Sequence, residues 1–471
     1  MQEGSAKLSA LPAQTQKAFG SWQLWAAALT SALGGFLFGY DWVVIGGAKP
    51  LYEAHFGIAL PQMQAWVMSC ALVGCLLGAI GSGPLSERLG RQRTLLVAAL
   101  VFTASAIGTG SAASLNDFIA WRIAGGIAIG MASVLSPIYI AEVAPAQIRG
   151  KLVCLNELTI VLGILAAQIV NWLIADPLSP HATLADLQGT WNELYGWRRM
   201  FEAAVIPATV FLVGLFFIPE TPRWLAAKGQ WDRARAVLTN LGGSEYASEV
   251  ISQMRLASDS LPSQPRKKPR VGPVLTIGVT LAVLQQWCGI NVIFNYAQEV
   301  FSAAGYALSA ILFNIVITGV TMCVFTFVAI ATVERLGRRA LMLFGCGSLA
   351  LIYVLIGWCY HSHQGGVLLL GLIVAAIAAY AMTLAPITWV ILSEIFPTSV
   401  RGTLMAVCSA SLWAACFVLT YSFPMLNASI GTAGTFWFYA GVCLAGFFFV
   451  RKYLPETKQQ SLEAIQRLWQ D

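Results

Sequence analysis

Twelve long apolar stretches run through the 471-residue chain, and they restrict its fold more than any other feature. A helix that crosses the hydrocarbon core of a bilayer needs about 20 mainly apolar residues. Hydrophobic residues make up 57% of the chain and charged residues only 11%, with a mean hydropathy of +0.70. Soluble domains carry roughly 25% charged residues, so this chain cannot cover a water-facing surface. The composition excludes a cytosolic enzyme, a nucleic-acid-binding protein and a disordered scaffold.

The apolar stretches predict twelve transmembrane helices and an all-α membrane protein. The chain also contains 43 glycines, and small residues allow helices to pack closely in lipid. The first stretch follows a polar segment and is too long to be the core of a cleavable signal peptide. The predicted spans are 22–46, 62–84, 94–113, 117–141, 152–176, 199–218, 272–302, 307–333, 340–359, 366–393, 402–424 and 433–453.

Lys and Arg residues are distributed unequally between the two ends of the predicted spans. Lys49, Arg198 and Arg199 fall on one side and Arg122 falls within a span, whereas all the others fall on the opposite side. Positively charged loops are retained in the cytoplasm, so this distribution predicts that both termini are cytoplasmic. All four histidines fall on the outer side, outside the predicted spans.

A polar segment at 219–271 divides the spans into two groups of six. It is expected to contain short helices at 231–241 and 246–257, followed by a basic run at 266–270 of the kind that flanks membranes. The predicted organisation is a cytoplasmic N-terminus (1–21), a six-helix bundle (22–218), a cytoplasmic linker (219–271), a second six-helix bundle (272–453) and a cytoplasmic tail (454–471).

Three motifs occur twice, in the same order in each half. Glu-Arg-Leu-Gly-Arg at 87–91 returns at 334–338. Glu-x-x-Pro-x-x-x-Arg-Gly at 142–150 returns at 394–402, and Pro-Glu-Thr at 219–221 returns at 455–457. Two six-helix halves related by an axis along the membrane normal are an architecture of transporters. The repeat therefore predicts two equivalent bundles, with every repeated motif at a cytoplasmic helix end.

The repeated motifs bring acidic and basic side chains to the same helix ends. Arginine forms forked hydrogen bonds with a carboxylate, and an exposed pair contributes only about 0–1 kcal/mol. Such weak pairs suit a cytoplasmic gate that holds the two bundles together and later releases them; simple anchoring at the membrane surface is the alternative. The predicted gating residues are Glu87, Arg88, Arg91, Glu142, Arg149, Glu220, Glu334, Arg335, Arg338, Glu394, Arg401 and Glu456.

Four strings of residues resemble the sugar porter family of the major facilitator superfamily. They are Gly-Pro-Leu-Ser-Glu-Arg-Leu-Gly-Arg at 83–91, Pro-Glu-Thr-Pro-Arg-Trp-Leu at 219–225, Gln-Gln-Trp-Cys-Gly-Ile-Asn at 285–291 and Pro-Glu-Thr-Lys at 455–458. The chain looks most similar to the bacterial xylose– and galactose–proton symporters and the animal glucose facilitators. The resemblance implies the twelve-helix major facilitator fold and transport of a sugar by alternating access.

The resemblance also implies a sugar site in the centre of the membrane. A sugar offers hydroxyl groups and an apolar ring face, so its site needs amides that both donate and accept, together with an aromatic plate. The amides of the seventh span lie beside Gly289, which permits a helix break; their alternative role is hydrogen bonding between helices. The implied sugar-binding residues are Gln285, Gln286, Asn291, Trp389, Glu157, Asn295, Phe38 and Trp413.

Trp389 follows Ala385-Pro386, where the tenth span is expected to break, and it would lie against the sugar ring. Trp389 matches the family pattern, but four positions hold residues that differ from those of the most similar sugar symporters. Glu157 stands where a glutamine commonly contacts sugar, Asn295 replaces a tyrosine, Met322 replaces an asparagine and Leu412 replaces a glutamine or asparagine. The particular sugar therefore does not carry over, and a smaller or less hydroxylated ligand, or a polyol, fits equally well.

Proton coupling is implied by two charged residues. Asp41 in the first span and Arg122 in the fourth hold the positions of the proton-carrying carboxylate and its arginine partner, whereas the facilitators have a neutral residue at the first position. A lone ionised carboxylate is costly in the bilayer, and an adjacent arginine stabilises its charged form. If the arginine moves away during transport, Asp41 takes up a proton. The alternative is a purely structural pair.

We therefore predict proton-coupled symport of a neutral monosaccharide, a hexose or pentose, across the cell membrane. A facilitated sugar or polyol uniporter is the nearest alternative, and a non-transporting sugar sensor is a third. The sequence contains no nucleophile elbow, Walker loop or metal-ligand cluster, so we expect no enzymatic activity, cofactor or metal. The expected partners are the sugar, protons and membrane lipids, without nucleic acid, and the chain is expected to work as a monomer.

Overall fold

The computed structural model describes residues 22–145, 148–176, 185–259, 271–303, 306, 308–396, 401–456 and 458. These residues form helices and turns without a strand, which confirms the all-α prediction. Among them, eleven helical stretches are long and apolar enough to cross a membrane. The longest helix, α20 (Arg401–Tyr453), contains 53 residues and reverses at Gly431, whose φ of 72° is not helical. It therefore supplies two spans, the eleventh and the twelfth.

The first half contains six spans. Five are single helices, whereas the sixth is assembled from a π-helical turn followed by two α-helices. The elements are α3 (Trp22–Phe56), α4 (Pro61–Leu89), α5 (Arg91–Gly110), α6 (Leu115–Val143), α7 (Arg149–Ile174), the short turn η1 (Ala185–Leu187), and then η2 (Asn192–Gly196), α8 (Trp197–Glu202) and α9 (Val205–Phe217).

Two spans of the second half are broken. The seventh divides at Gly289, as predicted, and the tenth divides at Thr383, whose φ of −130° and ψ of −91° end one helix just before Pro386. The elements that precede α20 are α13 (Val271–Trp287), α14 (Ile290–Asn295), α15 (Ala297–Ala303), α16 (Leu308–Leu336), α17 (Arg338–His361), α18 (Val367–Met382) and α19 (Leu384–Ile395).

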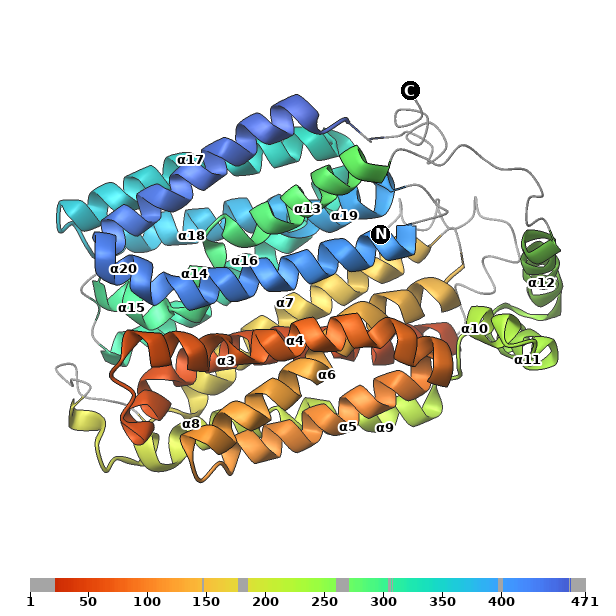
Figure 1. Ribbon diagram of the computed structural model, residues 1–471, viewed down its shortest axis with the longest axis horizontal. Coiled ribbons are helices and arrows are strands. Elements are labelled where there is room, and N and C mark those ends of the chain that lie inside the picture. The colour runs from red at the N-terminus through yellow and green to blue at the C-terminus, as the bar shows by residue number, and fades with distance from the viewer. Residues whose placement is uncertain are drawn as a thin grey trace, which may run out of the picture.

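Three short helices connect the halves: α10 (Pro222–Ala227), α11 (Trp231–Gly242) and α12 (Ser244–Asp259). The last two confirm the helices predicted at 231–241 and 246–257. They enclose a small hydrophobic cluster of their own, to which Leu238 and Ile251 belong. Figure 1 shows them beyond one end of the bundles, which we call the linker end, the opposite end being the distal end. The predicted basic run and residues 1–21 and 459–471 lie outside the described residues.

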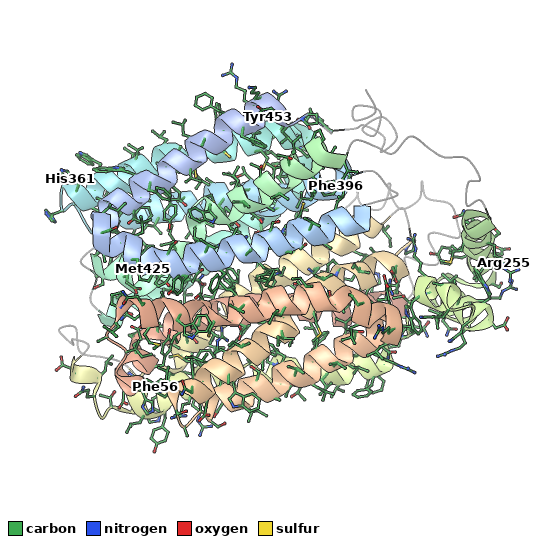
Figure 2. All side chains as sticks on the ribbon, viewed as in Figure 1. Phe56, Arg255, His361, Phe396, Met425 and Tyr453 are labelled. Carbon is green, nitrogen blue, oxygen red and sulfur yellow. The ribbon has the colours of Figure 1, made fainter. Side chains whose placement is uncertain are left out.

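The two halves lie side by side along their length (Figure 1). Within the first half α4 packs on α6 and α3 on α7; within the second half α17 packs on α20 and α16 on α18. Between the halves, α4 contacts α20, α7 contacts α16, and α3 contacts α14 and α15. Figure 2 places Phe56 and His361 at the distal end and Arg255 at the linker end.

Large apolar side chains cover the outside of both bundles. Phe217 is 83% exposed, Ile206 72% and Leu351 63%. Contiguous apolar surface of this kind is unusual on a soluble monomer, whereas lipid tails solvate it. The outer surface therefore matches a bilayer environment.

The first helix extends beyond the predicted span. The span was expected to end at residue 46, whereas α3 continues to Phe56. Lys49 lies inside this helix, towards the distal end, with 2% of its surface exposed. The lysine and Glu53 interrupt the apolar run, so the run of apolar residues stops before the helix does. The helix tolerates the lysine because two carboxylates neutralise it.

Four glycines allow α4 and α6 to touch. Gly74 and Gly78 of α4 face Gly126 and Gly130 of α6, and both pairs are four residues apart. A Cβ on any of them would lie between 2.0 and 2.2 Å from a backbone carbonyl oxygen of the facing helix. Small residues at this spacing let helix backbones approach closely in lipid.

We expect Gly78→Val to lower the melting temperature of the detergent-solubilised protein, because the added side chain overlaps the backbone of α6. Overpacking of this kind costs about 1–3 kcal/mol. Gly81→Val on the same helix is the matched control, since a Cβ at Gly81 meets nothing within 4 Å. Equal melting temperatures for the two variants would contradict the packing argument.

Candidate functional site

A break in the seventh span creates a cluster of amides. Gly289 adopts a φ of 88°, in the left-handed region, and a Cβ there would lie 2.6 Å from the ring of Tyr439. Both facts require glycine at this position. The break separates α13, which carries Gln285 and Gln286, from α14, which carries Asn291 and Asn295.

Three of these amides are hydrogen-bonded within the protein. Gln285 Nε2 donates to the carbonyl oxygen of Ala385 at 2.9 Å, beside the break in the tenth span. Asn291 Nδ2 donates to Gln286 Oε1 at 2.6 Å, and Gln286 Nε2 lies 3.5 Å from Gln285 Oε1. All three side chains are buried. The structure thus brings these predicted residues together and connects the two broken spans through them.

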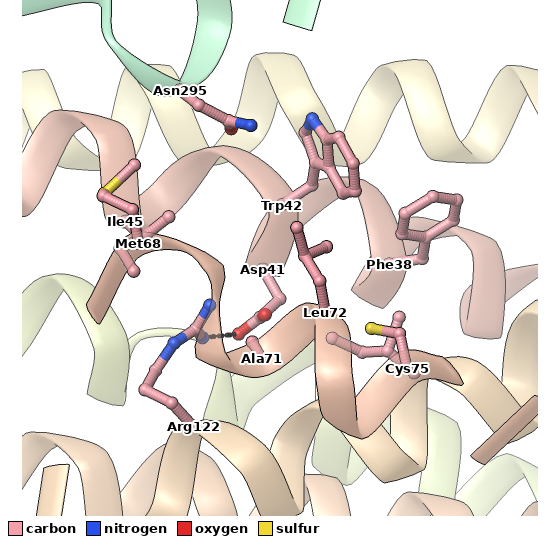
Figure 3. Close-up of a pocket in the computed structure, with 11 residues that line it drawn as sticks. Phe38, Asp41, Trp42, Ile45, Met68, Ala71, Leu72, Cys75, Arg122 and Asn295 are labelled. Atoms are coloured by element: carbon pink, nitrogen blue, oxygen red, sulfur yellow. Dashed lines mark hydrogen bonds and ion pairs between the residues drawn. The ribbon is translucent and has the colours of Figure 1, made fainter. Parts of the chain in front are cut away.

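Asn295 has a different environment. Its Oδ1 atom is buried without a hydrogen-bond partner. The side chain lines a cavity of about 20 Å³ that is also lined by Asp41, Trp42 and Arg122 (Figure 3). That volume holds about one water molecule, so a sugar does not fit into this cavity in the present conformation.

Aromatic rings bridge the two halves beside this cavity. The ring centroids of Phe38 and Trp42, both on α3, lie 5.4 and 6.0 Å from that of Trp413 on α20. Phe38 and Trp413 were predicted for the site, but Trp42 was missed. Its only signal in the sequence is its place next to Asp41, and a tryptophan in a membrane span usually serves packing. Trp389 lies on α19, partly exposed, and packs against the hydrophobic core.

Glu157 on α7 is partly exposed and forms no hydrogen bond or ion pair with any described residue. Every other predicted polar residue of the central site except Asn295 has a polar partner. A carboxylate without a partner inside a transmembrane span is costly. Such a residue is a candidate for contact with a ligand.

Asp41 and Arg122 form the predicted pair. Arg122 Nη1 donates to Asp41 Oδ1 at 2.5 Å, and the two residues are only 3% and 8% exposed, respectively. The guanidinium also lies over the ring of Phe201, 5.3 Å from its centroid. Figure 3 shows the ion pair at the edge of the small cavity, joining α3 to α6. Both helices belong to the first half, so the pair does not connect the bundles.

The repeated motifs build the same ion pair in each half. Arg91 Nη2 lies 3.1 Å from Glu142 Oε1, joining α5 to α6. Arg338 Nη2 lies 2.9 Å from Glu394 Oε1, joining α17 to α19. Each pair therefore lies within one half rather than between the halves.

The glutamates of the two Pro-Glu-Thr motifs cap the N-termini of helices. Glu220 accepts hydrogen bonds from the backbone N–H groups of Arg91 and Gln92 at 3.0 and 3.2 Å, and Glu456 accepts from that of Arg338 at 2.9 Å. Carboxylates at these positions stabilise the N-termini of α5 and α17. Burial raises the pKa of the Glu220 carboxyl, although its backbone N–H donors oppose the change.

The remaining predicted gating residues contribute less to the described structure. Glu87, Arg88 and Arg335 are exposed at the linker end. The side chains of Arg149, Glu334 and Arg401 lie outside the described residues. A cytoplasmic gate between the halves stays a prediction. The two Arg–Glu ion pairs described at the linker end each lie within one half.

Within the described residues, no group of three or more His, Cys, Asp and Glu side chains is arranged to hold a metal ion. The nine described cysteines are free, and all but Cys323 are buried. The candidate site is composed of amides, aromatic rings, the Asp41–Arg122 pair and Glu157, which has no polar partner among the described residues. Groups of this kind bind and orient a neutral polar ligand.

Known proteins resemble this chain over nearly its whole length. The family described as "Sugar (and other) transporter" matches residues 27–469. The D-xylose-proton symporter of Escherichia coli (strain K12) is 33% identical over 484 residues, covering 96% of this chain and 97% of the symporter. The arabinose-proton symporter of Bacillus subtilis (strain 168) is 35% identical, covering 93% of each chain.

A solved structure shares the architecture. The partially occluded inward open conformation of the xylose transporter XylE from E. coli aligns with a TM-score of 0.81 at 32% identity, covering 93% of this chain and 99% of that chain. This likeness agrees with the two six-helix halves described above. The chain therefore belongs to the sugar transporter family of the major facilitator superfamily and is a membrane transporter, not an enzyme.

Proposed function

We propose that this chain carries a neutral monosaccharide, a hexose or pentose, together with a proton across the cell membrane by alternating access. The buried Asp41–Arg122 pair at the edge of the central cavity carries this proposal. Ionisable groups at this depth are costly and mark ion pathways. Two similar proteins are a xylose-proton and an arabinose-proton symporter. The positive-inside rule favours a cytoplasmic linker end with cytoplasmic termini, and a distal end that faces outward.

The amide cluster supports recognition of sugar hydroxyls. A ligand would exchange the bond between Gln286 and Asn291 for hydroxyl contacts, and a hydroxyl would donate to the unpartnered Oδ1 of Asn295. Trp389 and the bridging aromatic rings supply apolar surface for the ring face. Neutral amides suit a neutral polyhydroxylated ligand because each both donates and accepts.

We expect Gln286→Ala to weaken sugar binding by roughly two- to tenfold, since a lost hydrogen bond costs about 0.5–1.5 kcal/mol. Calorimetric titration with the best ligand from a panel of hexoses, pentoses and polyols measures the effect. Gln253→Ala on the exposed face of α12 is the control and should leave affinity unchanged. An unchanged dissociation constant for Gln286→Ala would remove this residue from the site.

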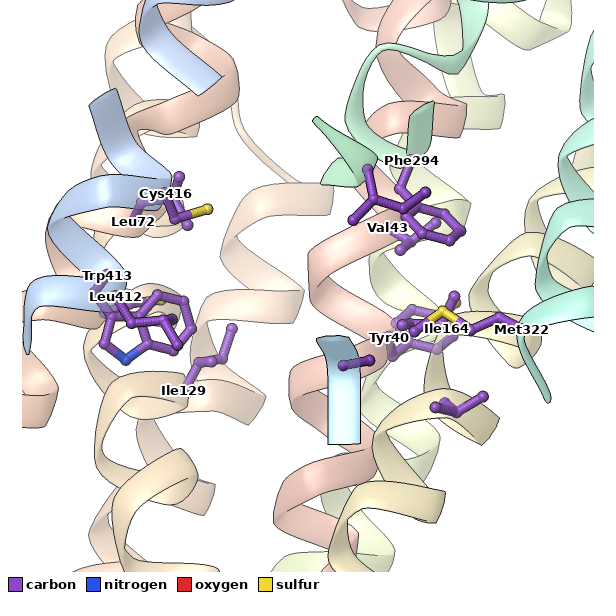
Figure 4. Close-up of a cluster of buried hydrophobic side chains, with 14 of the residues drawn as sticks. Tyr40, Val43, Leu72, Ile129, Ile164, Phe294, Met322, Leu412, Trp413 and Cys416 are labelled. Atoms are coloured by element: carbon purple, nitrogen blue, oxygen red, sulfur yellow. The ribbon is translucent and has the colours of Figure 1, made fainter. Parts of the chain in front are cut away.

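Two apolar residues support a ligand with fewer polar contacts. Met322 on α16 and Leu412 on α20 are 6% and 5% exposed and belong to the hydrophobic core between the halves (Figure 4). The family resemblance places amides at both positions. Their replacement by apolar groups favours a smaller or less hydroxylated sugar.

Glu157 is proposed to contact a hydroxyl of the ligand directly. Glu157→Gln keeps the shape of the side chain but turns two acceptors into one acceptor and one donor. We therefore expect it to change the order of affinities across the ligand panel. The change in binding free energy should differ by about 1 kcal/mol or more between the ligand that loses most affinity and the ligand that loses least. A uniform decrease for every ligand would instead assign Glu157 a structural or coupling role.

Coupling follows from the exchange of partners at Asp41. With Arg122 adjacent, the carboxylate stays ionised; when the arginine withdraws, an ionised carboxylate at this depth is unfavourable and binds a proton. One charge that moves across 100 mV supplies about 2.3 kcal/mol, which supports a roughly 40-fold gradient of sugar. That is sufficient for concentrative uptake.

We expect Asp41→Asn to abolish uphill uptake driven by a proton gradient, because the amide mimics a permanently protonated acid. Exchange of labelled for unlabelled sugar should persist, since neither the sugar site nor the conformational change needs a charge at this position. Both activities are measured on the same proteoliposomes. Accumulation of sugar by Asp41→Asn would place the proton elsewhere, with Glu157 the next candidate. A wild-type protein that never accumulates sugar under a proton gradient would be the facilitated uniporter.

A further inference from the structure

A buried ionic cluster at the distal end joins the two halves. Lys49 of α3 forms an ion pair with Glu299 of α15, and a second one, at 3.1 Å, with Glu53 one turn further along α3. The side chains of Lys49, Glu53 and Glu299 are 3%, 12% and 28% exposed. Glu299 belongs to the second half and the other two to the first. We call these three residues the distal triad.

The triad lies where the two halves touch. A Cβ on Gly46 would lie 2.6 Å from the backbone oxygen of Phe294, so α3 and α14 are in direct contact one turn from Lys49. The Lys49 ammonium also lies 5.7 Å from the ring centroid of Tyr296. The hydroxyl of Tyr296 donates to the carbonyl oxygen of Thr420 on α20 at 2.7 Å. Figure 1 shows α3, α14 and α15 meeting at this end. The distal end is therefore closed around the triad.

We propose that the distal triad is the outer gate of the carrier: Lys49 holds the halves together through Glu299 and is left with Glu53 when they separate. The proposal rests on transport by alternating access, the function proposed above. Opening carries Glu299 away with the second half, whereas Glu53 stays at position i+4 of the same helix, within reach of the lysine. Lys49 therefore never lacks a counter-charge.

The second carboxylate also makes the gate easy to open. In the closed state Lys49 attracts Glu299, but Glu53 and Glu299 carry like charges around one ammonium and repel each other. Both interactions disappear when the halves separate. A strong buried ion pair with no such opposition would lock the distal end, and a carrier must keep its two states close in free energy.

This arrangement gives the two carboxylates opposite effects. Glu299→Gln removes the attraction between the halves and leaves the Lys49–Glu53 pair intact, so it favours the open distal end. Glu53→Gln removes the repulsion in the closed state and takes from Lys49 its partner in the open state, so it favours the closed distal end. A lysine neutralised for purely structural reasons would respond to both losses in the same direction.

The gate is tested by the accessibility of a buried reporter from outside. Asn295→Cys places a thiol in the cavity beside the contact between the halves. Its rate of reaction with a membrane-impermeant thiol reagent, added to intact cells, is proportional to the fraction of protein that is open at the distal end. We expect Glu299→Gln to raise this rate about tenfold and Glu53→Gln to lower it several-fold. A tenfold change corresponds to about 1.4 kcal/mol.

Two controls and one substitute variant make the result specific. Glu202→Gln removes a carboxylate from the Arg199–Glu202 pair, which lies within the first half, and should leave the rate unchanged. The protein without the reporter gives the background from its own cysteines. Glu53→Leu, which also removes the charge, replaces Glu53→Gln if that variant does not fold.

Shifts in the same direction for Glu53→Gln and Glu299→Gln, or no shift for either, overturn the gate. The result is separable from the transport proposal, because the reporter measures opening without sugar or a proton gradient. Transport is measured on the same carboxylate variants without Asn295→Cys, because Asn295 belongs to the proposed sugar site. Opposite shifts of the reporter rate, together with a reporter-free protein that fails to transport sugar, would retain the gate and reject the substrate. Sugar transport accompanied by equal shifts would retain the function and reject the gate.

Discussion

The cost of placing a charge inside a lipid-surrounded bundle governs how this protein is built. Asp41 and Arg122 neutralise each other, and Lys49 is held by two carboxylates. An unpaired ion at such a depth is strongly unfavourable, so a carboxylate that loses its partner during transport must bind a proton. Glu157 is an exception to this pairing, because it has no partner among the described residues. The residues whose partners must change during transport are the ones that control it.

Contacts within each half differ in kind from contacts between the halves. Glycine-mediated backbone contacts and the Arg91–Glu142 and Arg338–Glu394 pairs bind helices of the same half. Between the halves lie aromatic rings, a few hydrogen bonds and the distal triad. Rigid halves joined by separable contacts are what alternating access requires, because each half moves as a unit about the central site.

The sequence predicted the fold and the amides that meet around the break in the seventh span, because these depend on local signals. The lengths of the apolar stretches predict the spans, and the repeated motifs predict two equivalent halves. Gly289, which stands beside three amides, predicts the break in the seventh span and the amide cluster around it. The burial of Lys49 could not be predicted, because its partner Glu299 lies far away in the sequence. The pairing of the repeated Glu and Arg residues within each half was equally hidden, since motif spacing does not say which helices meet. Trp42 gave no signal beyond its neighbour Asp41.

The most direct test of proton coupling measures the protons that move when sugar enters proteoliposomes down its own gradient, with no proton gradient imposed. In a lightly buffered suspension, addition of a transported sugar should make the external medium more alkaline at the rate of sugar uptake, and a protonophore should abolish the pH change. This result follows if Asp41 must be protonated for each inward passage of the loaded carrier. Sugar entry at the same rate with no change in external pH would contradict proton coupling.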